Sequence, residues 1–191
     1  MLINNDTIIK DDNPLIRTKS ADIQLPPRQD ELDLANDMMT YVKESIDPTI
    51  AEEKNLRAAV GISAIQVGVP KKITAIRIVM AEDENGDPTK VVELLWANAK
   101  IIKRSVQKAY LDMGEGCLSV PEEHPGHIQR AMRITVHAYD LVTNQWIDYR
   151  ASGYLAICIQ HELDHFNGVL FYDHIDPNDP MAVDEDAICI N

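Results

Sequence analysis

The sequence predicts an α+β fold in which strands and hairpins wrap around one central, buried helix. Residues 153–167 are apolar on most helical faces, which indicates a helix that is buried on all sides. Residues 133–140 alternate between apolar and polar side chains, as half-buried strands do. The length of 191 residues suits a single domain spanning residues 1–191, which can bury a sufficient core without disulfide bonds.

Local patterns predict the other elements in order. Helical spacing of apolar residues predicts a helix from Pro27 to Ile46, whose first turns carry acidic side chains. Residues 47–58 read as a polar connection, and Asn85-Gly86 marks a hairpin turn. An acidic tail follows Pro177. Further strands are expected at residues 73–80, 91–97, 100–106 and 145–150.

The composition excludes several classes of function. A formal net charge of −13 argues against direct nucleic-acid binding, since phosphate contacts need lysine and arginine. The small basic island at residues 100–108 is interpreted as a solvated strand edge. No apolar stretch approaches the length of a membrane span, and the N-terminus lacks the pattern of a signal peptide, so a cytoplasmic location is expected. Three cysteines point away from a disulfide framework.

The predicted central helix contains His161-Glu162-Leu163-Asp164-His165. Residues four apart lie one turn from each other on the same helical face, so the two imidazoles can bind one metal ion. Glu162 emerges beside that ion, where a base acting on metal-bound water is needed. Burying these three groups in an apolar helix is costly unless a metal compensates. We therefore interpret the motif as half of a metal centre.

The two histidines leave a tetrahedral site short of one protein ligand. A metzincin pattern would need a third histidine where the chain has Phe171. The acidic run 184–186 lies at the spacing of a thermolysin-type ligand, but in a polar tail without a helical pattern. Cys158 is seven residues from His165, or about 10.5 Å along a helix, which is too far for one ion. Its expected role is core packing.

Cys117 is the remaining candidate ligand. It lies in Gly114-Glu115-Gly116-Cys117-Leu118-Ser119-Val120-Pro121, where two glycines allow close approach of the backbone. We expect this segment to form an exposed turn, an unusual place for a structural cysteine. One cysteine and two histidines with an open fourth position suit a catalytic metal site.

Three segments together resemble the peptide deformylases. Gly61-Ile62-Ser63-Ala64-Ile65-Gln66 is similar to the first motif of that family, Glu115-Gly116-Cys117-Leu118-Ser119 to the second, and Gln160-His161-Glu162-Leu163-Asp164-His165 to the third. Their order agrees, and the resemblance extends over nearly the whole chain. The polar segment before Gly61 and the tail without a basic helix resemble the subclass of Gram-positive bacteria.

The resemblance implies that Cys117, His161 and His165 bind one divalent metal ion. The ion implied in the cell is Fe(II), with zinc, nickel or cobalt as possible substitutes. The substrate implied is the N-formylmethionine end of a nascent polypeptide at the ribosome of a bacterial cell. A monomer without membrane contact is expected.

The resemblance also implies the catalytic roles. Glu162 would be the general base and then the general acid. Gln66 would donate its side-chain amide to the developing oxyanion, together with the backbone N–H of Leu118. Gly61 would offer its backbone to the substrate. Loss of one oxyanion donor typically lowers the rate about 100- to 1000-fold.

The first motif departs from the family pattern at Ala59, Ser63 and Ile65. None of these positions is expected to supply a reacting group, so they bear on the shape of the substrate pocket. By position, Ile62, Ile65 and Ile157 are candidates to line a pocket for the methionine side chain.

Two other classes of protein share part of this pattern. A zinc endopeptidase would share the helix motif but not the segment around Cys117. A binding protein with a structural zinc would need a fourth protein ligand. His124 and His127 lie near Cys117 in the sequence, but in a segment expected to form a surface turn.

Overall fold

The computed structural model describes residues 2–86 and 88–190. Its strands are Gly61–Ser63 (β1), Ile73–Glu82 (β2), Pro88–Arg104 (β3), Lys108–Leu111 (β4), Arg130–Ala131 (β5), Arg133–Asp140 (β6), Gln145–Ser152 (β7) and Ile188–Ile190 (β8). Its α-helices are Gln29–Glu44 (α1), Pro48–Lys54 (α2) and Gly153–His165 (α3), with 3-10 turns at Pro14–Arg17 (η1), Ala64–Val67 (η2) and Phe171–His174 (η3).

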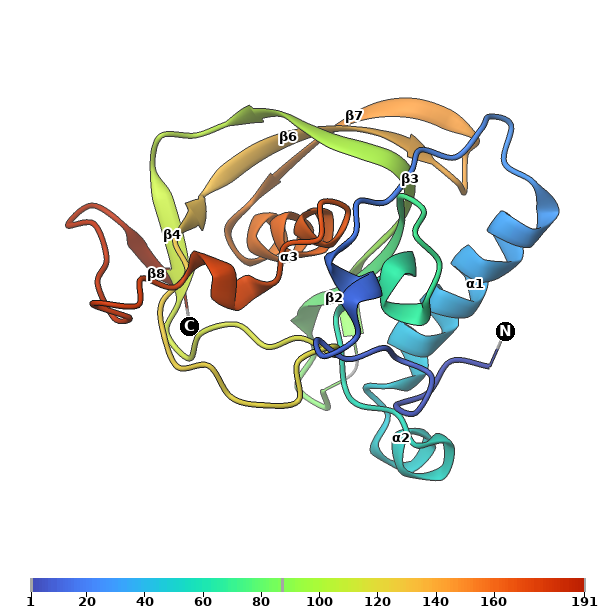
Figure 1. Cartoon of the computed structure of the whole chain (residues 1–191), viewed down its shortest axis with the longest axis horizontal. Coiled ribbons are helices and arrows are strands. Elements are labelled where there is room, and N and C mark those ends of the chain that lie inside the picture. The colour runs from blue at the N-terminus through green and yellow to red at the C-terminus, as the bar shows by residue number, and fades with distance from the viewer. Residues whose placement is uncertain (1, 87, 191) are drawn as a thin grey trace.

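Helix α3 lies in the middle of the molecule, with strands around it (Figure 1). One sheet has the strand order β1-β2-β3-β6-β7, and its neighbouring strands are antiparallel. The second sheet has the order β5-β4-β8 and lies at the opposite side of α3 from α1 (Figure 1). The predicted α+β arrangement around a central helix is therefore confirmed.

The five-stranded sheet separates two hydrophobic cores. Because successive side chains of a strand point to opposite faces, the strands β2, β3 and β6 contribute to both cores. Ile73 and Ala75 of β2 belong to the core that contains Met38 of α1. Ile76 belongs to the core that contains Leu155 of α3. The sheet thus holds α1 on one face and α3 on the other, which fixes α3 inside the molecule.

Helix α3 is buried along most of its length, as its apolar sequence predicts. It begins at Gly153, whose φ of 60° joins it directly to β7, and it ends at His165. The predicted end at Asn167 is two residues too late. Gly168, with a φ of 70°, then turns the chain away. In the sequence, the glycine that follows the helix is the feature that indicates where the helix ends.

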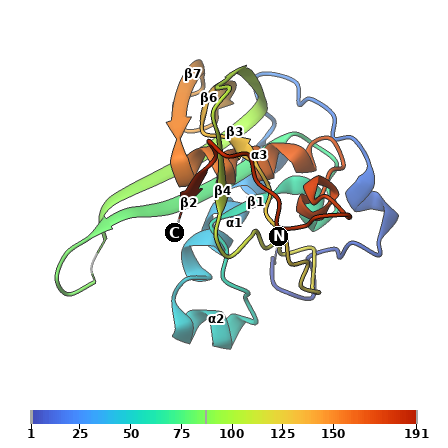
Figure 2. The same ribbon diagram turned by 90° about the vertical axis from the view of Figure 1, so that its left-hand side faces the viewer.

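Strand β3 is one long strand where two shorter strands were predicted. Its register with β6 shifts between Ala97 and Lys100, and Asn98 there has a φ of 52°. This irregularity interrupts the alternation of side chains, which explains the predicted break. Together β2 and β3 form a hairpin that extends away from the rest of the molecule (Figure 2). The predicted turn is confirmed, since the Gly86 N–H donates to the Asp83 carbonyl.

Several short elements were not predicted, namely the strands β1, β4, β5 and β8 and helix α2. Helix α2 lies in the expected polar connection, and the Asp47 side chain caps it by accepting from the N–H groups of Thr49 and Ile50. No residue of α2 is buried, so no apolar periodicity reveals it. The acidic tail ends in β8, which pairs in parallel with β4. Within the described ranges, no helix has the length and apolar character needed to cross a membrane.

We predict that Gly168→Ala destabilises the fold more than Gly68→Ala does. Both glycines have positive φ, which costs an alanine about 1 kcal/mol. An added Cβ at Gly168 would also lie 2.0 Å from the Arg17 carbonyl oxygen, whereas nothing lies within 4 Å at Gly68. Because backbone cannot yield easily, we expect Gly168→Ala to lower the free energy of unfolding by at least about 3 kcal/mol. Equal losses in denaturant titrations would contradict this.

Candidate metal centre

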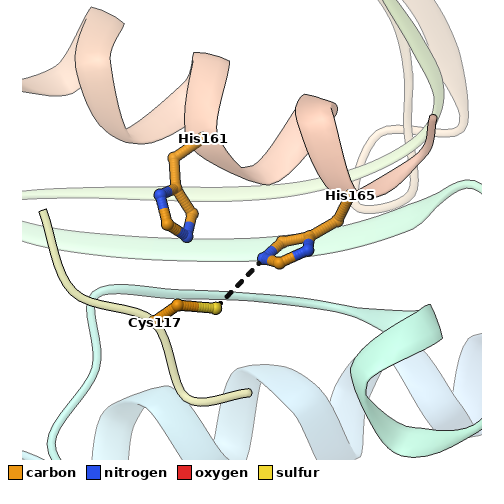
Figure 3. Close-up of side chains that lie close together, drawn as sticks. All are labelled: Cys117, His161 and His165. Carbon is orange, nitrogen blue, oxygen red and sulfur yellow. Dashed lines mark hydrogen bonds between the residues drawn. The ribbon is translucent and has the colours of Figure 1, made fainter. Parts of the chain in front are cut away.

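Helix α3 and the segment between β4 and β5 bring three metal-binding side chains together. His161 and His165 point from successive turns of α3 toward Cys117, which lies in a loop beside the helix (Figure 3). One ligand atom from each residue lies within 4.8 Å of the other two. The Cys117 Sγ is 3.4 Å from the His165 Nε2. A tetrahedral ion with zinc-like bond lengths separates a thiolate and an imidazole nitrogen by about 3.5 Å. The geometry therefore fits an ion.

Cys117 is buried, although its segment was predicted to be an exposed turn. Only 6% of Cys117 is exposed, and it packs with Ile65, Val120 and other apolar residues in a small core. The prediction was wrong because the glycines and polar neighbours of Cys117 indicate a turn, but they do not indicate which other segments of the chain pack over that turn. The cover comes from η2 and from the N-terminal segment, which are distant in the sequence.

Cys117 and His161 stabilise the charged forms of each other's side chains. Burial raises the pKa of the Cys117 thiol, but the nearby His165 and His161 lower it well below its ordinary value, which favours the thiolate. Burial lowers the pKa of His161, but Cys117 and Glu115 raise it well above its ordinary value. A divalent cation would interact favourably with the Cys117 thiolate and the Glu115 carboxylate, so the donor set fits a metal by charge as well as by distance.

His161 is held in place by a buried carboxylate. The His161 Nδ1 is 2.8 Å from Glu115 Oε2, and this contact leaves Nε2 facing Cys117. Arg130 donates to both carboxylate oxygens of Glu115 and also to Asp164. Burial raises the pKa of Glu115, but His161 and Arg130 lower it to about 2, so the carboxylate stays charged. No role was predicted for Glu115 from the sequence, although Glu115 lies within the second motif.

Glu162 lies beside the two histidines and is held by Ser63. It is buried, and its Oε2 accepts a hydrogen bond from the Ser63 hydroxyl at 2.8 Å. Burial raises the pKa of Glu162, while His165, His161 and Ser63 act in the opposite direction without cancelling the shift. A carboxylate with a raised pKa is suited to exchange protons near neutral pH. Ser63 thus orients Glu162, a contact that was not predicted from its place in the first motif.

Gly61 approaches Glu162 more closely than any other residue type could. A Cβ added to Gly61 would lie 2.7 Å from Glu162 Oε1. Ser63 already fixes the other oxygen, so the carboxylate has little room to move. The glycine that opens the first motif is therefore needed at this position for the orientation of Glu162.

The side-chain amide of Gln66 faces the same site. Its Oε1 accepts from the backbone N–H of Ser63 at 2.8 Å, which fixes the orientation of the amide. Its Nε2 consequently points toward Cys117 Sγ at 3.5 Å and Ser119 Oγ at 3.3 Å. The contact to the Ser119 oxygen is long for a hydrogen bond and the contact to sulfur is intrinsically weak, so the amide can turn to a stronger acceptor.

A cavity of about 320 Å³ opens beside these groups. Its lining comprises Ile46, Arg57, Ala58, Ala59, Val60, Gly61, Gln66, Leu111, Glu115, Gly116, Cys117, Leu118, Tyr154, Ile157, Cys158, His161 and Glu162. Ile157 lines the cavity as predicted, whereas Ile62 and Ile65 do not, because both are fully buried in the cores. Cys158 packs in a core and also reaches the cavity. Burial raises the pKa of its thiol to about 12, so it remains neutral.

The sequence matches the family model described as polypeptide deformylase over residues 5–181. The chain belongs to this family. Two relatives are each 41% identical over 189 residues. They are a peptide deformylase of Ligilactobacillus salivarius, over 99% of this chain and all of the relative, and peptide deformylase 2 of Bacillus subtilis, over 99% of both. Both organisms are Gram-positive, in agreement with the predicted subclass.

Solved structures show the same fold. A probable peptide deformylase of Synechococcus phage S-SSM7 has a TM-score of 0.68 at 26% identity, over 88% of this chain and 98% of that chain. Peptide deformylase 1B of Arabidopsis thaliana also has a TM-score of 0.68 at 26% identity, over 90% and 82% respectively.

The family assignment settles the class of reaction. The chain is a metal-dependent enzyme that removes the formyl group from the N-terminal methionine of new polypeptides. This confirms the interpretation drawn from the three sequence motifs. The zinc-endopeptidase and structural-zinc interpretations are set aside.

We predict that Glu115→Gln weakens metal binding by about 10- to 100-fold. Glutamine keeps the shape of the side chain but removes the negative charge next to His161, and such outer partners typically contribute this much to affinity. Competition with a chromophoric chelator would measure the affinity. Glu122→Gln, an exposed position in the same segment, is the matched control and should bind as the parent does. Equal affinities for the two variants would refute a role for Glu115.

Proposed function

We propose that Cys117, His161 and His165 hold the catalytic ion of this deformylase. The observation that carries the proposal is the convergence of their three ligand atoms within 4.8 Å at the wall of the cavity. The ion proposed for the cell is Fe(II), while zinc, nickel and cobalt suit the same donors. When bound, such an ion acts as a Lewis acid that makes water a nucleophile near neutral pH.

Glu162 is proposed to carry the proton through the reaction. Hydrolysis forms a bond between the water oxygen and the formyl carbon and breaks the bond from that carbon to the methionine nitrogen. Glu162 takes the proton of the attacking water and delivers it to the leaving nitrogen, as general base and then general acid. Its burial, its raised pKa and its place next to His161 support this role.

Gln66 and Leu118 are proposed to stabilise the negative charge that develops on the formyl oxygen. The Gln66 Nε2 lies 3.5 Å from the Cys117 thiol, Leu118 directly follows Cys117 in the chain, and both residues line the cavity. Donors that are already oriented stabilise such charge without reorganisation. Gly61, the first residue of β1, is proposed to offer its backbone to the substrate.

The cavity is proposed to receive the formyl-methionine end of a nascent chain. Apolar side chains at its wall, among them Ile157, Leu111 and Ile46, suit a methionine side chain. We further propose that residues 1–191 form one catalytic domain that acts as a monomer at the ribosome in the bacterial cytoplasm.

The proposed role of Glu162 predicts the loss of formate release in Glu162→Gln. With the metal loaded anaerobically and a short formyl-Met peptide as substrate, we expect kcat to fall at least about 100-fold while metal content is unchanged. Glutamine keeps the side-chain volume but cannot accept the proton. Glu53→Gln, an exposed position on α2, should keep the parental rate. A fully metal-loaded Glu162→Gln with parental kcat would overturn the proposed mechanism.

A further inference from the structure

The peptide unit between Cys117 and Leu118 is held from its carbonyl side. Arg57 Nη1 donates to the Cys117 carbonyl at 3.2 Å and to the Val120 carbonyl at 3.2 Å. The Val120 N–H also donates to the Cys117 carbonyl at 3.2 Å. Two donors, one of them charged, therefore meet on a single carbonyl oxygen.

The other end of this peptide unit is free. The N–H of Leu118 donates to no other residue within 2–86 and 88–190. On the far side of Leu118, its carbonyl accepts from Lys10 Nζ at 3.0 Å. The backbone is thus held on both sides of one N–H group that remains available to a ligand in the cavity.

A peptide unit is planar, so fixing its carbonyl also fixes the direction of its N–H. A positive charge at the carbonyl oxygen draws electron density from the amide nitrogen, which makes the N–H a stronger donor. Arg57 forms no ion pair with a carboxylate in the described part of the chain that would neutralise this effect.

We infer that Arg57 is a positioning residue, which orients and polarises the Leu118 N–H for the formyl oxygen. This inference rests on the proposed role of Leu118 as an oxyanion donor. Arg57 comes from the segment after α2, before the first motif, so the polar connection that precedes β1 contributes to the catalytic site. Because Arg57 acts only through the peptide unit, its effect falls on the transition state more than on substrate binding.

Arg57→Met tests the inference, since methionine retains part of the apolar stem and removes the charge. We expect kcat for a formyl-Met peptide to fall about tenfold, which is less than the decrease caused by removing an oxyanion donor altogether. KM should stay within about twofold of the parental value. Metal content and the melting temperature should stay parental. In the zinc-loaded protein, the amide proton resonance of Leu118 should move upfield. Arg57→Lys should recover part of kcat, and Arg104→Met, at the end of β3, should change none of these quantities.

Other outcomes overturn the inference. A raised KM with parental kcat would mean that Arg57 binds the substrate itself. Loss of metal would mean that Arg57 serves the Cys117 thiolate, and a lowered melting temperature with parental kcat would mean a structural role. Glu162→Gln tests the proposed function separately. If that variant is inactive while Arg57→Met keeps full kcat, only the inference on Arg57 fails. If Glu162→Gln is fully active while Arg57→Met loses kcat, only the proposed role of Glu162 fails.

Discussion

The placement of three polar groups on one largely buried helix is the constraint on which the rest of the structure depends. Glu162 and His165 of α3 are buried, and the side chain of His161 is only 12% exposed, so unpartnered polar groups there would cost several kcal/mol. Each side chain has a partner from another element, and among the fully buried nitrogen and oxygen atoms of these three groups only the Nδ1 of His165 lacks a hydrogen-bond partner within the described residues. Glu115 contacts His161, Ser63 contacts Glu162, and the thiol of the β4–β5 segment contacts His165. These partners, together with the three groups of α3, make up the candidate metal centre.

The surrounding fold fixes the distances between those partners. Gln160, which precedes the two histidines, pairs its side-chain amide with both backbone groups of Ala131 and so fastens α3 to β5. The irregular N-terminal segment joins the two sides of the cavity, because the Ile9 N–H donates to the Gln66 carbonyl and the Asp11 N–H to the Ser119 carbonyl. Segments that carry no catalytic group thereby set the geometry of those that do.

The sequence was most informative where one local pattern decides the structure. The apolar character of α3 and the spacing of His161 and His165 predict both the central helix and half of the metal site, because helical geometry alone aligns those side chains. The burial of Cys117 and the contact of Ser63 with Glu162 depend on segments distant in the sequence, so no local pattern contains them. Helix α2 was missed for a different reason, since a helix without a buried face leaves only its cap at Asp47 as a signal.

The most direct test of this account is X-ray absorption at the metal edge of the loaded protein. We predict one sulfur at about 2.3 Å and two imidazole nitrogens at about 2.0–2.1 Å for zinc, with the sulfur lost in a metal-loaded Cys117→Ser variant. Glu115 would remain outside the coordination sphere, against His161. A site without sulfur in the parent protein, or with carboxylate oxygen in its place, would contradict the central claim that the cysteine loop completes the site begun by α3.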